Sequence, residues 1–264
     1  MSWLDYFDTT GLDCVDFLIG DSVSTPPDMR QRFTETVLRI EPSRLCYAPP
    51  DYAPAPQPPP ILRNGYPTFG SFNRLAKLAE PVVDLWARLL NVVPQARLLL
   101  KSAAFNHPAT CKVFATRFQQ RGIAANRLEL RGSSTHSQML AEYADVDIAL
   151  DPFPYNGGVT TCEALWMGVP VVMLLGDSML SRQSAALLTS AGLAHWIART
   201  DDEWLAIVSE LASQPQRLAQ IRRSLRPMIA SSALIDGPRF ADRFAALLEE
   251  IRRSAEHRSG NAFS

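Results

Sequence analysis

The sequence has no excess of charge of either sign, because 26 basic and 27 acidic residues give a formal net charge of −1. It therefore lacks the strongly basic surface that nucleic acids and anionic membranes attract, and we expect neither as a partner. No apolar run is long enough to span a membrane. The first residues, MSWLDYFDTTGLD, carry acids and no long apolar core, so they do not have the composition of a signal peptide.

Cysteine is also scarce, and its spacing excludes two kinds of site. Cys14, Cys46, Cys111 and Cys162 form no CxxC pair, and the four histidines are equally dispersed, so we predict no metal site. Four scattered cysteines in a chain of this length fit a reduced, cytoplasmic compartment. The Gly-x-Gly-x-x-Gly fingerprint and the P-loop lysine motif are absent too, which makes a nicotinamide-dependent dehydrogenase a weak hypothesis.

What the sequence does contain is a regular alternation of short apolar runs with amphipathic segments. Such alternation predicts an α/β fold with a doubly wound parallel sheet. Strands are predicted at residues 12–21, 45–47, 66–73, 97–100, 128–131, 146–150 and 171–175, and helices at 28–38, 80–93, 107–121, 138–144, 162–167, 181–190, 201–212, 215–228 and 238–253.

Prolines crowd together in the segment PPDYAPAPQPPP, residues 49–60. This composition disfavours a helix and favours an extended polyproline II conformation. We therefore predict a stiff linker, placed at residues 49–64, that separates a short N-terminal piece from the main domain. A ligand for a proline-binding module is the less favoured alternative.

The stretch from Asp145 to Gly176 has the pattern of a strand, a glycine turn, a helix and a second strand. Gly157 and Gly158 precede the helix, which Thr160 or Thr161 could cap. Because a helix N-terminus offers free N–H groups and partial positive charge, this turn is a candidate site for a phosphate. A simple left-handed turn with a threonine cap is the alternative interpretation.

A carboxylate and two further loops extend this candidate site. Glu163 lies in the first turns of the helix, where it could reach the hydroxyls of a ribose, or where it could merely favour the helix dipole. Ligands of parallel sheets bind beyond the carboxyl ends of the strands. We therefore expect three polar loops to converge on one crevice, at residues 71–77, 132–136 and 156–161.

Three segments together carry a family resemblance: DIALDPFPYNGGVTTCEALWMGVPVV, SRQSAALLTSAGL and TFGSFNRLAKL. From about Tyr6 to about Arg252 the chain resembles the C-terminal catalytic region of the O-GlcNAc transferase and SPINDLY family, most of all its bacterial members. The resemblance implies a lobe of the two-lobed GT-B fold. It also implies metal-independent transfer of N-acetylglucosamine from UDP-N-acetylglucosamine to protein Ser or Thr, with inversion and without a cofactor. GDP-fucose is the alternative donor, because FPYNGG and TTCEALWMGVP are similar to the SPINDLY branch.

The resemblance also assigns site residues. Lys77 matches the lysine that contacts the donor diphosphate, and it is the one residue expected to take part in catalysis. Met139 stands where the family often has a histidine, and His136 could replace that histidine. The other expected donor-binding residues are Asn73, Arg74, Ser133, Ser134, Gly157, Gly158, Val159, Thr160, Thr161 and Glu163.

The resemblance further implies a missing partner. A DTTGLD segment that lies inside the family's catalytic region is found here at Asp8–Asp13, so residues 1–48 are expected to be a remnant of the acceptor lobe, followed by a donor lobe at 65–236. An upstream lobe with tetratricopeptide repeats, or a partner, would supply the rest, and this chain alone could be an inactive binding lobe. Residues 237–255 are expected to pack back toward the acceptor lobe, with an apolar stripe near Phe240 and Phe244 exposed or covered by a dimer. Residues 256–264 are expected to be disordered.

Overall fold

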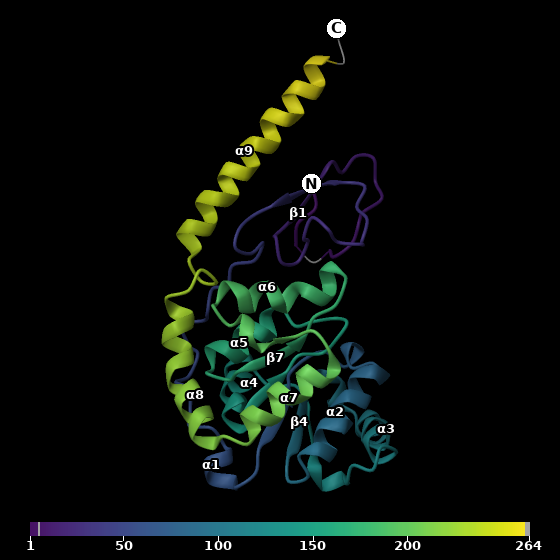
Figure 1. Cartoon of the computed structure of the whole chain (residues 1–264), viewed down its shortest axis with the longest axis vertical. Coiled ribbons are helices and arrows are strands. Elements are labelled where there is room, and N and C mark those ends of the chain that lie inside the picture. Colours follow the sequence, from purple (N-terminus) through teal and green to yellow (C-terminus); the bar gives the residue numbers. More distant parts are fainter. Residues whose placement is uncertain (5, 262–264) are drawn as a thin grey trace.

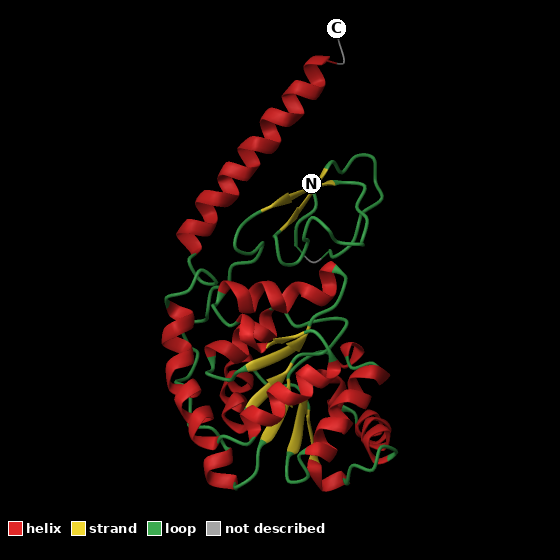
Figure 2. Cartoon of the chain, in the orientation of Figure 1, coloured by secondary structure: helices red, strands yellow, loops and turns green. Residues whose placement is uncertain are grey.

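The protein is built around a six-stranded sheet in which every strand pair is parallel (Figures 1 and 2). The computed structural model describes residues 1–4 and 6–261, except for the side chains of 255–261. The strand order is β5–β4–β3–β6–β7–β8. The strands are β3 (Thr68–Ser71), β4 (Arg97–Lys101), β5 (Leu128–Arg131), β6 (Ile148–Leu150), β7 (Val171–Leu174) and β8 (Ile197–Ala198).

Helices cover both faces of this sheet, which confirms the predicted doubly wound α/β fold. Helix α2 contacts α3 and α7, whereas α5 contacts α6 and α8. From β3 the chain proceeds to β4 and β5 at one edge of the sheet, and from β6 it proceeds to β7 and β8 at the other edge. Because the crossovers are right-handed, the helices that connect the first three strands lie on one face of the sheet and those that connect the last three lie on the opposite face. The helices are α1 (Ile61–Asn64), α2 (Glu80–Val92), α3 (Pro108–Gln119), α4 (His136–Glu142), α5 (Val159–Trp166), α6 (Gln183–Ser190), α7 (Asp201–Ala212), α8 (Pro215–Ala230) and α9 (Gly237–Asn261).

Strands β6 and β7 are apolar without interruption because both of their faces are buried. Leu98, Leu100 and Ile148 are completely buried, and Trp86 of α2 and Trp204 of α7 fill the layer beside the sheet. Among the described residues, no helix combines the length and the apolar composition that crossing a bilayer requires.

The sheet changes its winding direction between two neighbouring strands, β3 and β6. At such a point the connections leave toward opposite sides, so a crevice opens at the carboxyl ends of the two strands. The segment after β3 begins at Phe72 and the segment after β6 begins at Asp151. The fold therefore places two of the three predicted polar loops next to each other.

The N-terminal segment differs from its prediction. A second sheet consists of the parallel strands β1 (Phe17–Gly20) and β2 (Thr36–Arg39), so the helix predicted at residues 28–38 is wrong. Pro26 and Pro27 suit the start of a helix, but pairing with β1 and the branched side chains of Thr36 and Val37 favour a strand. Residues 45–47, predicted as a strand, form a loop.

Helix α9 packs against this N-terminal segment (Figure 1). The ring of Trp3 lies 4.4 Å from that of Phe244 and 6.2 Å from that of Phe240, measured between centroids. Leu247 joins the same small core as Ile19. The prediction that the stripe near Phe240 and Phe244 is exposed or needs a dimer is therefore wrong, because the chain covers it with its own Trp3. The helix continues to Asn261, past the predicted start of disorder at 256, and residues 262–264 lie outside the described residues.

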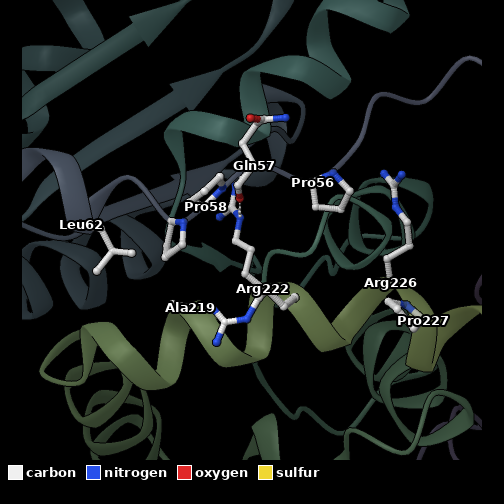
Figure 3. Close-up of a pocket in the computed structure, with 10 residues that line it drawn as sticks. Pro56, Gln57, Pro58, Leu62, Ala219, Arg222, Arg226 and Pro227 are labelled. Atoms are coloured by element: carbon white, nitrogen blue, oxygen red, sulfur yellow. Dashed lines mark hydrogen bonds between the residues drawn. The ribbon is translucent and has the colours of Figure 1, made fainter.

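The proline-rich segment is held against the main domain by two arginines of α8 (Figure 3). Nε of the buried Arg222 donates to the carbonyl oxygen of Gln57 at 2.7 Å, and the remaining guanidinium nitrogens donate to the carbonyls of Val146 and Tyr143. Arg226 donates to the carbonyl of Pro54 at 2.7 Å. A pocket of about 540 Å³ lies between this segment and α8. The segment is thus a fixed part of the structure as well as a connection.

Candidate functional site: a cationic cleft at the start of α5

Lys77 stands at the end of a short 3₁₀ turn that follows β3. Its Nζ donates to the carbonyl oxygen of Asn156 at 2.7 Å and to Oδ1 of Asn73 at 3.3 Å. The same ammonium lies 4.2 Å from the centre of the Tyr155 ring. Burial lowers the pKa of Lys77, and the negative charge of Asp151 acts in the opposite direction. The lysine is thus fixed by the loop after β6 before any ligand binds.

That loop leads into α5, whose N-cap is Gly158 and whose first residue is Val159. The prediction of a threonine cap is wrong, and so is the alternative of a left-handed turn, because Gly158 has φ −127°. Both positions need glycine because neighbouring side chains leave no room for a Cβ atom. A Cβ on Gly158 would lie 2.7 Å from Nε2 of Gln183, and one on Gly157 would lie 2.7 Å from Oδ1 of Asp151.

The first amide groups of α5 are available to a ligand. Gly157 N–H donates to Oδ1 of Asp151 at 2.8 Å, but within the described chain the N–H groups of Gly158, Val159 and Thr160 have no hydrogen bond. Free N–H groups together with the helix dipole form an anion site. Val159 is 63% exposed, so a ligand can approach its amide from solvent.

Lys77 and this helix start line the same cleft, which has a volume of about 710 Å³. Asn73 connects them, because its Oδ1 accepts hydrogen bonds from Lys77 Nζ at 3.3 Å and from Thr160 Oγ1 at 3.2 Å. Arg74 lies at the same cleft and is exposed. The structure therefore brings an ammonium, a guanidinium and a helix N-terminus together, an arrangement that favours an anionic ligand.

Two buried oxygens beneath the cleft have no partner among the described residues, Asp151 Oδ2 and Asn156 Oδ1. Burial raises the pKa of Asp151 to about 6, although hydrogen bonds and the charge of Lys77 oppose the increase. Thr161, predicted to contact a ligand, is buried, and its hydroxyl lies 3.1 Å from that of Ser184. Its side chain thus supports the loop from below.

Glu163 is paired with His136, the first residue of α4. Oε1 of Glu163 lies 2.7 Å from Nε2 of His136, and the carboxylate is 5% exposed. Burial raises the pKa of Glu163, and His136 opposes this increase. The segment that follows β5 therefore meets α5 at this pair, but neither Glu163 nor His136 lines the cleft that contains Lys77.

Three other predicted residues are engaged elsewhere. Ser133 exchanges hydrogen bonds with Asn106, and Ser134 Oγ donates to Oε1 of Glu142 at 2.8 Å. Met139 packs against the main hydrophobic core. None of these three side chains lines the cleft that contains Lys77.

Several residues that line the cleft were not among the predicted site residues, and Tyr155, Phe7 and Gln183 make the contacts that matter for its shape. Tyr155 covers Lys77, and Phe7 contacts Tyr155 edge-on with 5.9 Å between ring centroids. Gln183 donates from Nε2 to the carbonyl of Gly157 at 3.0 Å. A signal for Gln183 and Tyr155 existed, because both belong to the segments that carry the family resemblance, whereas Phe7 has no local pattern that indicates a site.

Comparison with known proteins supports one family. The model of the family "Glycosyl transferase family 41" matches residues 62–244. A probable UDP-N-acetylglucosamine–peptide N-acetylglucosaminyltransferase SPINDLY of Arabidopsis thaliana is 41% identical over 91% of this chain. The corresponding protein named SEC, from the same plant, is 25% identical over 91% of the chain. The match covers 26% of the SPINDLY protein, so the chain spans about a quarter of that relative.

Solved structures agree with this assignment. An O-GlcNAc transferase mutant of Thermobaculum terrenum superimposes with a TM-score of 0.85 at 36% identity, covering 95% of this chain and 47% of that one. A sucrose-phosphate synthase of Thermosynechococcus elongatus gives a TM-score of 0.60 at 12% identity, covering 90% of this chain and 59% of that one. The second similarity concerns the fold alone.

Proposed function

Because the chain belongs to glycosyl transferase family 41, we propose that it binds the diphosphate of a nucleotide sugar between Lys77 and the N-terminus of α5. In this proposal it is the donor-binding part of a protein O-N-acetylglucosaminyltransferase. The donor is UDP-N-acetylglucosamine and the acceptor is a Ser or Thr hydroxyl of a protein. The observation that carries the proposal is the position of Lys77 and Gly158 in one cleft.

The proposed chemistry needs positive charge at the leaving group. The bond between the anomeric carbon and the diphosphate oxygen breaks as the acceptor hydroxyl attacks from the opposite side, which inverts the anomeric centre. Negative charge then grows on the departing nucleoside diphosphate. Lys77 and the free amides of α5 are fixed where they can stabilise that charge, without reorganisation during the reaction. We assign no general base to this chain.

The remaining residues bind and orient the nucleotide. Asn73 keeps Lys77 and Thr160 in register, and the exposed Arg74 adds a second cation at the cleft. Glu163 accepts hydrogen bonds from the ribose hydroxyls with the oxygen that His136 leaves free. These contacts bind the donor before and during the transfer.

Removal of the Lys77 ammonium tests the placement of the diphosphate. We expect Lys77→Ala to weaken UDP binding about ten- to hundredfold, because a charge-assisted hydrogen bond contributes about 1.5–3 kcal/mol. The measurement is isothermal titration calorimetry at fixed, low salt. Lys112→Ala is the matched control, since Lys112 is an exposed lysine of α3 and should leave the affinity unchanged. Equal affinity of the Lys77 variant and the wild type contradicts the proposal.

The donor nucleotide is tested separately. GDP-fucose is the alternative donor, favoured by the higher identity to SPINDLY than to SEC. Thermal-shift titration with UDP, GDP, UDP-N-acetylglucosamine and GDP-fucose compares the two. A clear preference for GDP rejects the UDP assignment but leaves the diphosphate site in place.

The activity of the chain by itself is a third question. Donor hydrolysis or peptide glycosylation by the purified chain is the assay. Sustained turnover rejects the alternative that this chain binds donor but transfers nothing without a further lobe. Binding without turnover supports that alternative.

A further inference from the structure

Among the described residues, the side chain of Glu163 has one hydrogen-bond partner, the imidazole of His136. Its carboxylate is 5% exposed, and its Oε1 lies 2.7 Å from Nε2 of His136. No other hydrogen bond of this carboxylate is found in the described part of the chain, so Oε2 is left for a ligand. The direction in which Oε2 points therefore depends on how firmly His136 holds Oε1.

His136 is itself held by a residue 84 positions earlier, Tyr52 of the proline-rich segment. The Tyr52 hydroxyl lies 2.7 Å from Nδ1 of His136. When the ring is neutral, the phenol donates to Nδ1 and the proton of the ring must be on Nε2. When the ring is protonated, both nitrogens carry protons. In both states Nε2–H points at Glu163. Without Tyr52 only the carboxylate of Glu163 favours this tautomer, so a larger share of the rings can carry the proton on Nδ1.

The backbone that carries Tyr52 is fixed although the side chain itself is 59% exposed. Arg222 donates to the carbonyl of Gln57 at 2.7 Å (Figure 3). Arg226 donates to the carbonyl of Pro54, also at 2.7 Å. Prolines at positions 54 and 56 further restrict the backbone. The segment therefore presents the Tyr52 hydroxyl to α4 at a defined place.

We propose that Tyr52 is a positioning residue of the nucleotide site: acting through His136, it fixes Oε1 of Glu163 and leaves Oε2 for the ribose hydroxyls of the donor. The inference rests on the proposed function, because it presupposes that Glu163 binds a ribose. It gives the proline-rich segment a part in donor recognition that its composition does not indicate.

The test compares a nucleotide that has both ribose hydroxyls with one that lacks them. Affinities for UDP and 2′,3′-dideoxy-UDP are measured by calorimetry for the wild type, Tyr52→Phe and Tyr66→Phe. If GDP binds better than UDP, GDP and 2′,3′-dideoxy-GDP are used instead. Tyr66 is a control because it contacts Arg97, away from the cleft. We expect the wild type and Tyr66→Phe to prefer the ribonucleotide. In Tyr52→Phe we expect this preference to fall about three- to tenfold, as the loss of one partly exposed hydrogen bond implies.

A second variant separates positioning from a general loss of structure. His136→Gln places an amide N–H near the position of Nε2, so it can hold Glu163 without a tautomer to select. In the His136→Gln background, Tyr52→Phe should therefore have no further effect on ribose preference. Nitrogen NMR of His136 in the ligand-free protein should show protonated Nε2 in the wild type and a larger share of protonated Nδ1 in Tyr52→Phe.

The outcomes are distinguishable. If the wild type binds no nucleoside diphosphate, the proposed function fails. If it binds and prefers the ribonucleotide, but Tyr52→Phe keeps the full preference, the positioning role of Tyr52 is refuted while the proposed function stands. A wild-type ring protonated on Nδ1 alone also refutes it.

Discussion

Asp151 provides the sharpest test of how the cleft is built, because its carboxylate is buried beneath Lys77 with one oxygen unpartnered. Oδ1 accepts from the Gly157 amide at 2.8 Å, whereas Oδ2 has no partner among the described residues. Asp151→Asn can keep the oxygen that Gly157 needs and replaces the unpartnered one. The variant should therefore remove the charge while the loop before α5 keeps its conformation.

The magnitude follows from proton linkage. Burial raises the pKa of Asp151 from 3.8 to about 6. The folded protein thus binds this proton more tightly than the unfolded chain, and the stability it contributes is complete below pH 3.8 and is lost as the pH rises through 6. A tenfold change in proton affinity is worth about 1.4 kcal/mol, so the loss amounts to about 3 kcal/mol in total and about 2 kcal/mol between pH 4 and pH 7.

Urea unfolding of wild type and variant at several pH values measures this directly. The free energy of unfolding of Asp151→Asn, relative to wild type, should increase by about 2 kcal/mol from pH 4 to pH 7. Asp147→Asn is the matched control, because burial also raises the pKa of Asp147 to about 6. Both oxygens of Asp147 accept backbone N–H groups, from Ile61 at 3.0 Å and Thr68 at 2.8 Å. In Asp147→Asn, the side-chain N–H₂ replaces one of these acceptors and faces a backbone N–H, which then has no hydrogen-bond acceptor. This variant should therefore be less stable than wild type at pH 7. Parallel pH dependences of wild type and Asp151→Asn would refute the assignment of a buried carboxylate with one oxygen that lacks a partner among the described residues.

Three further variants test other parts of the structure. Arg222→Met leaves the carbonyls of Gln57 and Val146 without a donor, and it leaves the carbonyl of Tyr143 with the Val146 N–H alone. The free energy of unfolding should therefore fall by about 3 kcal/mol, whereas Arg223→Met at an exposed position of α8 should change it little. The second variant concerns Glu35. Burial by itself raises the pKa of Glu35, but hydrogen bonds from threonines outweigh it and lower this pKa from 4.5 to about 2. Its contribution to stability is present above pH 4.5 and lost as the pH falls toward 2, so Glu35→Gln should show a smaller loss of thermal stability on acidification. Trp3→Ala removes the ring that covers the apolar stripe of α9, so amide hydrogen exchange should accelerate in α9 while the six-stranded sheet keeps its protection.

The sheet was predictable because its strands are short apolar runs that end in polar or glycine-containing loops. Val146 to Leu150 is too short for a helix, and Asp151 and Pro152 end it, so a buried strand is the consistent interpretation. The same reasoning failed in the N-terminal segment. There the conformation of residues 36–39 depends on pairing with β1, which lies about twenty residues earlier and leaves no local pattern.

The cleft was predictable in its backbone and less so in its side chains. Gly157 and Gly158 indicated a helix start with free amides, but the actual N-cap is Gly158, because Thr160 turns toward Asn73. Ser133 could not be placed from sequence, because its partner Asn106 belongs to the preceding connection of the sheet. Such contacts depend on which loops the topology brings together, and local patterns carry no information about them.

The network around Asn73 has a consequence for how the site operates. Lys77 and α5 belong to connections that follow different strands, β3 and β6, yet each is bound to Asn73, and Lys77 also donates to Asn156 in the loop before α5. The Lys77 ammonium and the partial positive charge at the N-terminus of α5 repel each other weakly. Without these contacts, this repulsion would favour a Lys77 conformation that points into solvent. The contacts hold both sources of positive charge in place in the absence of an anion. The proposed diphosphate ligand would therefore meet positive charges that are already in place, and little of its binding energy would be needed to arrange the protein.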